Sequence, residues 1–255
     1  MEPTDLLLLC VAAFAAGLVD AVVGGGGLIQ IPALFGVLPQ APPATLFGTN
    51  KLASIFGTAS AAFRYARRID VPWRAALPAA LAAFVLSYFG AMTVSMMPSE
   101  WLRPLVLALL IVLTGYTYAR KNLGAVDQRR VLGRKDMLLA AMFGGVIGFY
   151  DGFFGPGTGS FLVFMFVRFF GLDFLRASVS SKIVNTATNL AALLFFGGNT
   201  HVLLTTGLVM AVFNIGGSLI GSHLAIRHGA GFVRRVFLGV AGLLTLKFGW
   251  DTFIP

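Results

Sequence analysis

The chain has 255 residues, of which 57% are hydrophobic and 11% are charged, and its mean hydropathy is +0.85. A soluble domain carries about 25% charged and about 45–50% apolar residues, so this composition excludes an ordinary soluble protein and predicts an all-α polytopic membrane protein. The net charge of +9 comes from basic residues that lie mostly between apolar runs, which is the positive-inside pattern and argues against a nucleic-acid-binding face.

The first half of the chain contains four long apolar runs and one short one. The long run Leu6–Val23 contains an aspartate near its end and is followed by four glycines. The shorter piece Leu28–Leu38 comes after them. Three longer runs come next, at about 44–66, 74–96 and 101–119. The start, MEPTD, has no basic segment, so we expect a retained span and not a signal peptide.

The second half repeats this order of runs. Its first long run is Met137–Phe154, its short piece is Gly159–Leu172, and three longer runs follow at about 176–196, 202–225 and 233–253. The prediction is therefore eight long spans and two short ones.

The two halves align without a gap when the sequence is shifted by 131 residues. The shift places Asp151 on Asp20 and Lys182 on Lys51. Asp and Lys are among the rarest residue types here, so chance matching of glycines does not explain the alignment. We infer a duplication. Its predicted parts are a first membrane repeat, a basic cytoplasmic linker and a second membrane repeat, at residues 1–122, 123–136 and 137–255.

The basic connections predict how the repeats are oriented. They lie near residues 64–74, 120–135, 168–176 and 227–235, whereas 39–44 and 197–201 carry no Lys or Arg. All four fall on the cytoplasmic side if the short pieces cross the membrane, which gives five crossings per half and hence inverted repeats. A re-entrant short piece would put one basic connection outside. Eleven helical residues rise only ~16 Å against a core of ~30 Å, so a crossing short piece must be tilted, extended or shielded.

A glycine-rich break precedes each short piece, in GLVDAVVGGGGLIQIP and in GFYDGFFGPGTGSFLV. Glycine stops one helix there, and the next helix begins with backbone N–H groups that form an anion site together with the helix dipole. Inverted repeats with broken helices hold the site of many secondary transporters near the bilayer midplane. The glycines predicted to bind substrate are Gly24, Gly25, Gly26, Gly155 and Gly157.

Two lysines inside the apolar runs accompany the breaks. Inversion brings Lys51 and Lys182 toward the midplane from opposite sides. In the functional reading, both ammonium groups and the break amides hold a small anion, with hydrogen bonds from Asn50, Ser181 and Asn185. The three asparagines Asn185, Asn189 and Asn214 are further candidates for an aqueous path, because each amide needs several partners.

Two aspartates stand just before the breaks, Asp20 in the first half and Asp151 in the second. A charge in hydrocarbon costs at least ~2.5–3.5 kcal/mol, and pairing with an opposite charge lowers that cost. The alternative reading is therefore two internal Asp–Lys salt bridges that join the halves without any ligand. Proton coupling and structural pairing are equally compatible with these two carboxylates.

Enzymatic and metal-binding patterns are missing from the sequence. GGGGLIQ lacks the lysine and hydroxyl of a P-loop, and neither GxSxG nor HExxH occurs. The three histidines have no i, i+4 partner among themselves, and the single Cys10 allows no intrachain disulfide. We expect no enzyme, no cofactor and no metal site, and the oligomeric state stays open. His223 is expected near the cytoplasmic boundary without a role, and the run FLVFMFVRFF is expected to face lipid.

The first-half motif D-x-x-x-G-G-G-G followed by GTNKL, and the second-half motif D-x-x-x-G-P-G-T-G followed by SSKIVN, resemble the sulfite exporter TauE/SafE family, also described as toluene sulfonate uptake permeases. The resemblance covers essentially the whole chain. It implies an ion-coupled, multi-pass transporter of the bacterial inner membrane, whose relatives move sulfite, organosulfonates or other small anions. Ser181 stands where the first half has Asn50, so the two half-sites are not equivalent.

The predicted function is secondary transport of small, sulfur-containing anions by alternating access, with the site at the repeat interface and coupling to a proton or a cation. An anion channel would need the same positive lining without coupling. A membrane scaffold would use the Asp–Lys pairs only to hold the halves together.

Overall fold

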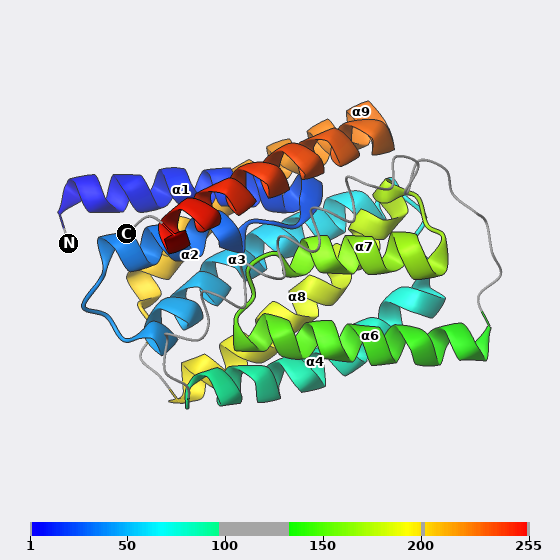
Figure 1. Cartoon of the computed structure of the whole chain (residues 1–255), viewed down its shortest axis with the longest axis horizontal. Coiled ribbons are helices and arrows are strands. Elements are labelled where there is room, and N and C mark those ends of the chain that lie inside the picture. Colours follow the sequence, from blue (N-terminus) through cyan, green and yellow to red (C-terminus); the bar gives the residue numbers. More distant parts are fainter. Residues whose placement is uncertain (1, 97–132, 200–201, 254–255) are drawn as a thin grey trace.

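The structure is a computed structural model that describes residues 2–96, 133–199 and 202–253. These residues are helical, and no strand occurs among them. The helices are α1 (Pro3–Val23), α2 (Gly27–Val37), α3 (Pro43–Ala66), α4 (Trp73–Val94), α6 (Arg134–Phe153), α7 (Thr158–Phe170), α8 (Phe174–Asn199) and α9 (Leu204–Phe253). In Figure 1, α1 packs along α9 at the upper edge and α4 along α6 at the lower edge, with the other helices between them.

Four helices are long and apolar enough to cross a membrane, which makes the chain a multi-pass membrane protein. They are Pro3–Val23, Trp73–Val94, Arg134–Phe153 and Leu204–Gly229. The two short pieces are also helices, α2 and α7. Helices α3 and α8 have 24 and 26 residues, but they carry the buried lysines and asparagines and are less apolar than those four.

Several predicted segments have other ends in the structure, or lie outside the residues that the structure describes. The predicted run at 101–119 lies outside the described residues, as does the predicted linker up to residue 132. The last three linker residues form the first turn of α6, which begins at Arg134. The run at 233–253 continues α9 beyond Gly229, where the backbone leaves helical geometry.

The predicted glycine breaks are confirmed as helix ends. Helix α1 ends at Gly24, whose φ of 83° lies in the left-handed region that a side chain disfavours. Between α6 and α7, Gly155 and Gly157 have φ of 91° and 80°. The two breaks also touch each other: the Ser160 N–H donates to Gly24 O at 3.1 Å, and the Ser160 hydroxyl donates to Val23 O at 2.8 Å.

Contacts between the halves occur in matched pairs. The Ser87 hydroxyl donates to Thr188 O at 2.9 Å, and the Ser218 hydroxyl donates to Gly57 O at 2.6 Å. Shifting one of these contacts by 131 residues produces the other. The two halves therefore contact each other through equivalent residues.

Helices α3 and α8, which correspond to each other at that shift, run in opposite directions. Gly48 near the start of α3 faces Phe196 near the end of α8. Farther along α3, Asn189 Nδ2 donates to Thr58 Oγ1 at 3.5 Å, from nearer the middle of α8. Figure 1 shows both helices running diagonally between the two outer pairs of helices.

The prediction that FLVFMFVRFF faces lipid is wrong. Phe166 and Phe170 are 0% and 2% exposed, and only Phe169 of the three is exposed, at 38%. Helix α7 contacts α6, α8 and α1, and six of the ten residues at 161–170 are buried. A helix that is apolar on every face is typical of such an interior position.

Small residues let α4 and α6 approach closely. Gly144, Gly148 and Gly152 follow one another at four-residue spacing on α6 and face Ala79, Ala83 and Ser87 on α4. A Cβ on Gly148 would overlap the backbone of Ala83. This small-xxx-small pattern is how membrane helices gain packing contacts when lipid is as apolar as their side chains.

We expect Gly148→Ala to lower the free energy of unfolding by about 1–3 kcal/mol, because the added methyl group overpacks the α4–α6 interface. The matched control is Gly36→Ala, since nothing lies within 4 Å of a Cβ at Gly36 and alanine favours a helix. The measurement is the thermal unfolding midpoint of the purified protein in detergent. Equal shifts for both variants would contradict the close packing.

Candidate functional site

Two buried ion pairs lie where the halves meet. Lys51 Nζ is 2.7 Å from Asp151 Oδ2, and Lys182 Nζ is 2.9 Å from Asp20 Oδ2. Each pair joins a lysine of one half to the aspartate before the other half's break. The structure thus brings together all four charged residues that the sequence singled out, in a reciprocal arrangement.

The two pairs differ in how far they are open. The side chains of Lys51 and Asp151 are 4% and 3% exposed, whereas those of Lys182 and Asp20 are 1% and 16% exposed. The Thr58 hydroxyl lies 3.4 Å from Asp20 Oδ2 and supports this more open carboxylate. The two ion pairs therefore have equivalent partners, but the Asp20 carboxylate is more exposed to solvent than the Asp151 carboxylate.

The Lys51 ammonium sits directly against the second break. A Cβ placed on Gly155 would be 3.0 Å from Lys51 Nζ, so glycine leaves the room that the ammonium occupies. The Tyr150 hydroxyl donates to Pro156 O at 2.7 Å and fixes the loop between α6 and α7. The break and the lysine are held as one unit.

A small cavity of about 20 Å³ lies at this centre. Nine of the twelve predicted site residues line it: Asp20, Gly24, Gly26, Asn50, Lys51, Asp151, Gly155, Gly157 and Asn185. The remaining three, Gly25, Ser181 and Lys182, do not. The volume suffices for about one water molecule and is too small for an oxyanion of several atoms, so a ligand can enter only when the centre expands.

The predicted hydrogen-bonding residues have different surroundings. The Ser181 hydroxyl donates to Gly159 O at 2.9 Å and so holds the second break in place. Asn185 Oδ1 accepts from Asn189 Nδ2 at 3.0 Å. Asn50 is 4% exposed and its Oδ1 has no hydrogen-bond partner among the described residues, which leaves an unsatisfied polar group on the wall of the cavity.

Sequence reasoning missed Gln30, which is 0% exposed. Its Nε2 donates to Asn50 O at 3.3 Å, and its Oε1 accepts from Asn214 Nδ2 at 2.9 Å. The repeat gave no hint of it, since Phe161 stands at the corresponding position. The available signal was a single amide side chain inside the short apolar piece LIQIP.

The four charges of the centre balance one another. Two ammonium groups and two carboxylates sum to zero, and each ammonium already has a carboxylate. One amide at the start of α7, that of Ser160, is also engaged with Gly24 O. Neither of these two ammonium groups is therefore an unpaired positive charge.

Comparison with known proteins agrees with the motifs. The family model "Sulfite exporter TauE/SafE" matches residues 9–248. The probable membrane transporter protein ORF9 of Sinorhizobium sp is 37% identical, covering 98% of this chain and 94% of its own length. The probable membrane transporter protein YfcA of Escherichia coli K12 is 34% identical, with 99% and 92% covered. A probable membrane transporter protein of Methanocaldococcus jannaschii is 26% identical, with 94% and 95% covered. No solved structure matches the chain.

We expect Lys51→Met to lower the free energy of unfolding by about 3 kcal/mol, because it leaves the Asp151 carboxylate buried without its partner. Adding Asp151→Asn should recover most of that loss, since no unpaired charge then remains in the interior. Thermal unfolding of the wild type, both single variants and the double variant gives the coupling energy. Additive losses in the double variant would show that the pair contributes no such coupling.

Proposed function

The chain belongs to the sulfite exporter TauE/SafE family of transmembrane transporters, and we propose that it is a secondary carrier of small anions in the bacterial inner membrane. The observation that carries the proposal is the reciprocal pairing of Lys51 with Asp151 and of Lys182 with Asp20 where two helix breaks meet. Such a site, built equally from both halves, suits a carrier whose halves move against each other.

The proposed architecture is two inverted repeats, each with four long spans and one short span, joined by a cytoplasmic linker. Three observations support it: the opposite directions of α3 and α8, the contacts that repeat at a shift of 131 residues, and the basic connections that all fall on one side in this topology. Alternating access then exchanges the conformations of the two repeats about the central site.

The proposed substrate is a small oxyanion, with sulfite and organosulfonates as the first candidates. Lys51 supplies positive charge on the wall of the cavity, and the amides of Asn50 and Asn185 line the same cavity. A half-turn of the Asn50 amide would direct its NH₂ group at an anion. The family's name adds sulfite as the reference compound.

The proposed coupling ion is a proton. The four central charges cancel, so a bound monovalent anion would leave a net charge of −1 in a site of low dielectric constant. Protonating Asp151 restores neutrality and releases Lys51 to pair with the anion. Anion and proton then cross together, and neither leaves an unpaired charge in the bilayer.

The two ends of the molecule support alternating access. Where α3 ends near Arg64, a hollow of about 750 Å³ lies between α3 and α9. At the opposite end, rings from several helices are packed together: Tyr88 and Phe195 have centroids 5.4 Å apart, and Phe47 and Phe154 are 5.8 Å apart. In each of its two states, a carrier is open to one side of the membrane and closed to the other, and the hollow and the packed rings would give this molecule one open and one closed end.

We expect wild-type protein in liposomes to show counterflow: labelled substrate should enter faster when unlabelled substrate is present inside. The substrate is chosen first by thermal shift against sulfite, sulfate, thiosulfate, sulfonates and small carboxylates, since saturation at 100 times Kd adds ~2.7 kcal/mol to stability. Lys51→Met/Asp151→Asn should abolish both the shift and the counterflow.

The control for that experiment is Arg134→Gln, an exposed arginine at the start of α6. It should keep the transport of the wild type. Entry without counterflow would identify a channel. Full transport by the Lys51→Met/Asp151→Asn variant would show that this ion pair is not needed for transport and has only a structural role.

We expect an inward proton gradient to drive uptake above equilibrium in the wild type, whereas Asp151→Asn should keep anion exchange and lose the response to the gradient. The reason is that asparagine can neither bind nor release the proton. Uptake is measured in liposomes with imposed pH or sodium gradients. A response to sodium alone, or an unchanged pH response in Asp151→Asn, would refute proton coupling through this residue.

A further inference from the structure

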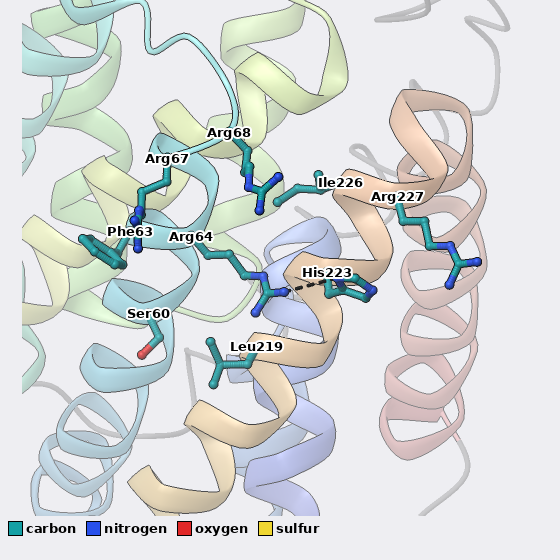
Figure 2. A pocket seen from close by; sticks show the side chains of 9 residues that line it. All are labelled: Ser60, Phe63, Arg64, Arg67, Arg68, Leu219, His223, Ile226 and Arg227. Carbon is teal, nitrogen blue, oxygen red and sulfur yellow. Dashed lines mark hydrogen bonds between the residues drawn. The ribbon is translucent and has the colours of Figure 1, made fainter.

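The hollow between α3 and α9 is lined by basic side chains from both helices. Arg64, Arg67 and Arg68 come from the end of α3, and His223 and Arg227 come from α9. Figure 2 shows Arg64 reaching across toward His223, with Arg68 directed at the α9 side. We call these five residues and the hollow between them the arginine cleft.

The charge of the arginine cleft is not neutralised within the described part of the chain. There, the ion pairs are those of Lys51, Lys182 and Arg176, and none involves an arginine of the cleft. The Arg67 guanidinium lies 5.4 Å from the centroid of the Phe63 ring, which orients its planar group. The guanidinium groups of Arg64 and Arg68 point across the hollow and those of Arg67 and Arg227 lie at its edges, and none of the four has a carboxylate partner among the described residues.

His223 holds the Arg64 side chain in position across the cleft. Arg64 Nη2 is 3.2 Å from His223 Nδ1, and a guanidinium can only donate, so Nδ1 accepts this bond. The proton of the neutral ring is then on Nε2, on the far side from Arg64. The Arg64–His223 contact links two residues that are 159 positions apart in the sequence.

The other half has no such cluster. The positions corresponding to Arg64, Arg67, Arg68, His223 and Arg227 are Phe195, Gly198, Asn199, Met92 and Met96. The positive-inside rule accounts for basic residues at this end of the molecule. It does not account for their meeting a histidine of a second helix around one hollow.

We propose that the arginine cleft binds an oxyanion, namely a phosphate, sulfate or sulfonate group, at a site separate from the central ion pairs. Guanidinium forks match the oxygen atoms of such groups and bind them with charge-assisted hydrogen bonds. The volume of about 750 Å³ suits a small molecule, and Phe63, Leu219 and Ile226 would cover a short apolar part of it.

The arginine cleft and the more exposed ion pair both lie beside α3. Six residues separate Arg64 from Thr58 on α3, which corresponds to about 9 Å of helix. The Thr58 hydroxyl is 3.4 Å from the Asp20 carboxylate, which is the more exposed one. An anion held in the cleft would therefore lie on the same side of the molecule as the more exposed carboxylate of the Lys182–Asp20 pair, about 9 Å along α3 from Thr58.

The test is equilibrium binding of radiolabelled sulfate to the full-length protein in phosphatidylcholine nanodiscs. The background is Lys51→Met/Asp151→Asn, in which the Lys51–Asp151 pair is removed and substrate binding at the centre is expected to be lost, so binding in the cleft is measured whether or not the proposed transport is correct. Adding Arg64→Gln/Arg227→Gln should weaken sulfate binding about tenfold or more, since each lost charge-assisted bond contributes on the order of a tenfold change in affinity.

Arg134→Gln is the matched control and should leave sulfate binding unchanged. Arg67→Gln/Arg68→Gln repeats the test with two exposed side chains, should the first combination fail to fold. Nanodiscs with added phosphatidylglycerol distinguish the sources of the anion: competition by this lipid assigns the cleft to lipid phosphates, and unchanged sulfate binding assigns it to dissolved anions. Sulfate binding that does not depend on the cleft arginines overturns the proposal.

Discussion

The structure depends on two reciprocal ion pairs in the middle of an apolar chain. An isolated lysine or aspartate there is costly, and the pairing of Lys51 with Asp151 and of Lys182 with Asp20 lowers that cost. Because each pair takes one member from each half, neither half could bury its own charges without the other. The requirement to pair them ties the two halves into one centre.

The glycines are a consequence of that requirement. For the carboxylate of one half to reach the ammonium of the other, the backbone must approach closely and the helices must stop at the right depth. Gly24 and Gly155 end α1 and α6 in left-handed conformations, and Gly155 leaves space for the Lys51 ammonium. Glycines on α6 bring it against α4 in the same way. Helix propensity is given up at these positions for contact between the halves.

The centre is nearly symmetric and its surroundings are not. The partners of the ion pairs exchange at a shift of 131 residues, yet one aspartate is more exposed, one end carries arginines and the other end carries packed aromatic rings. Duplicated charges provide the site. The residues that differ between the halves make its two ends unlike.

The sequence by itself determined the helical runs within the described residues, both glycine breaks and the four central charges, because hydropathy, backbone freedom and the match at a shift of 131 residues are visible in the sequence. Only the tertiary structure decided which lysine meets which aspartate, that Gln30 and Asn214 bond beside them, and that Phe166 is interior and not lipid-facing. It also brought Arg64 to His223 from a different helix. A local pattern gives the character of a helix, but its neighbours depend on how distant helices pack, which no single stretch encodes.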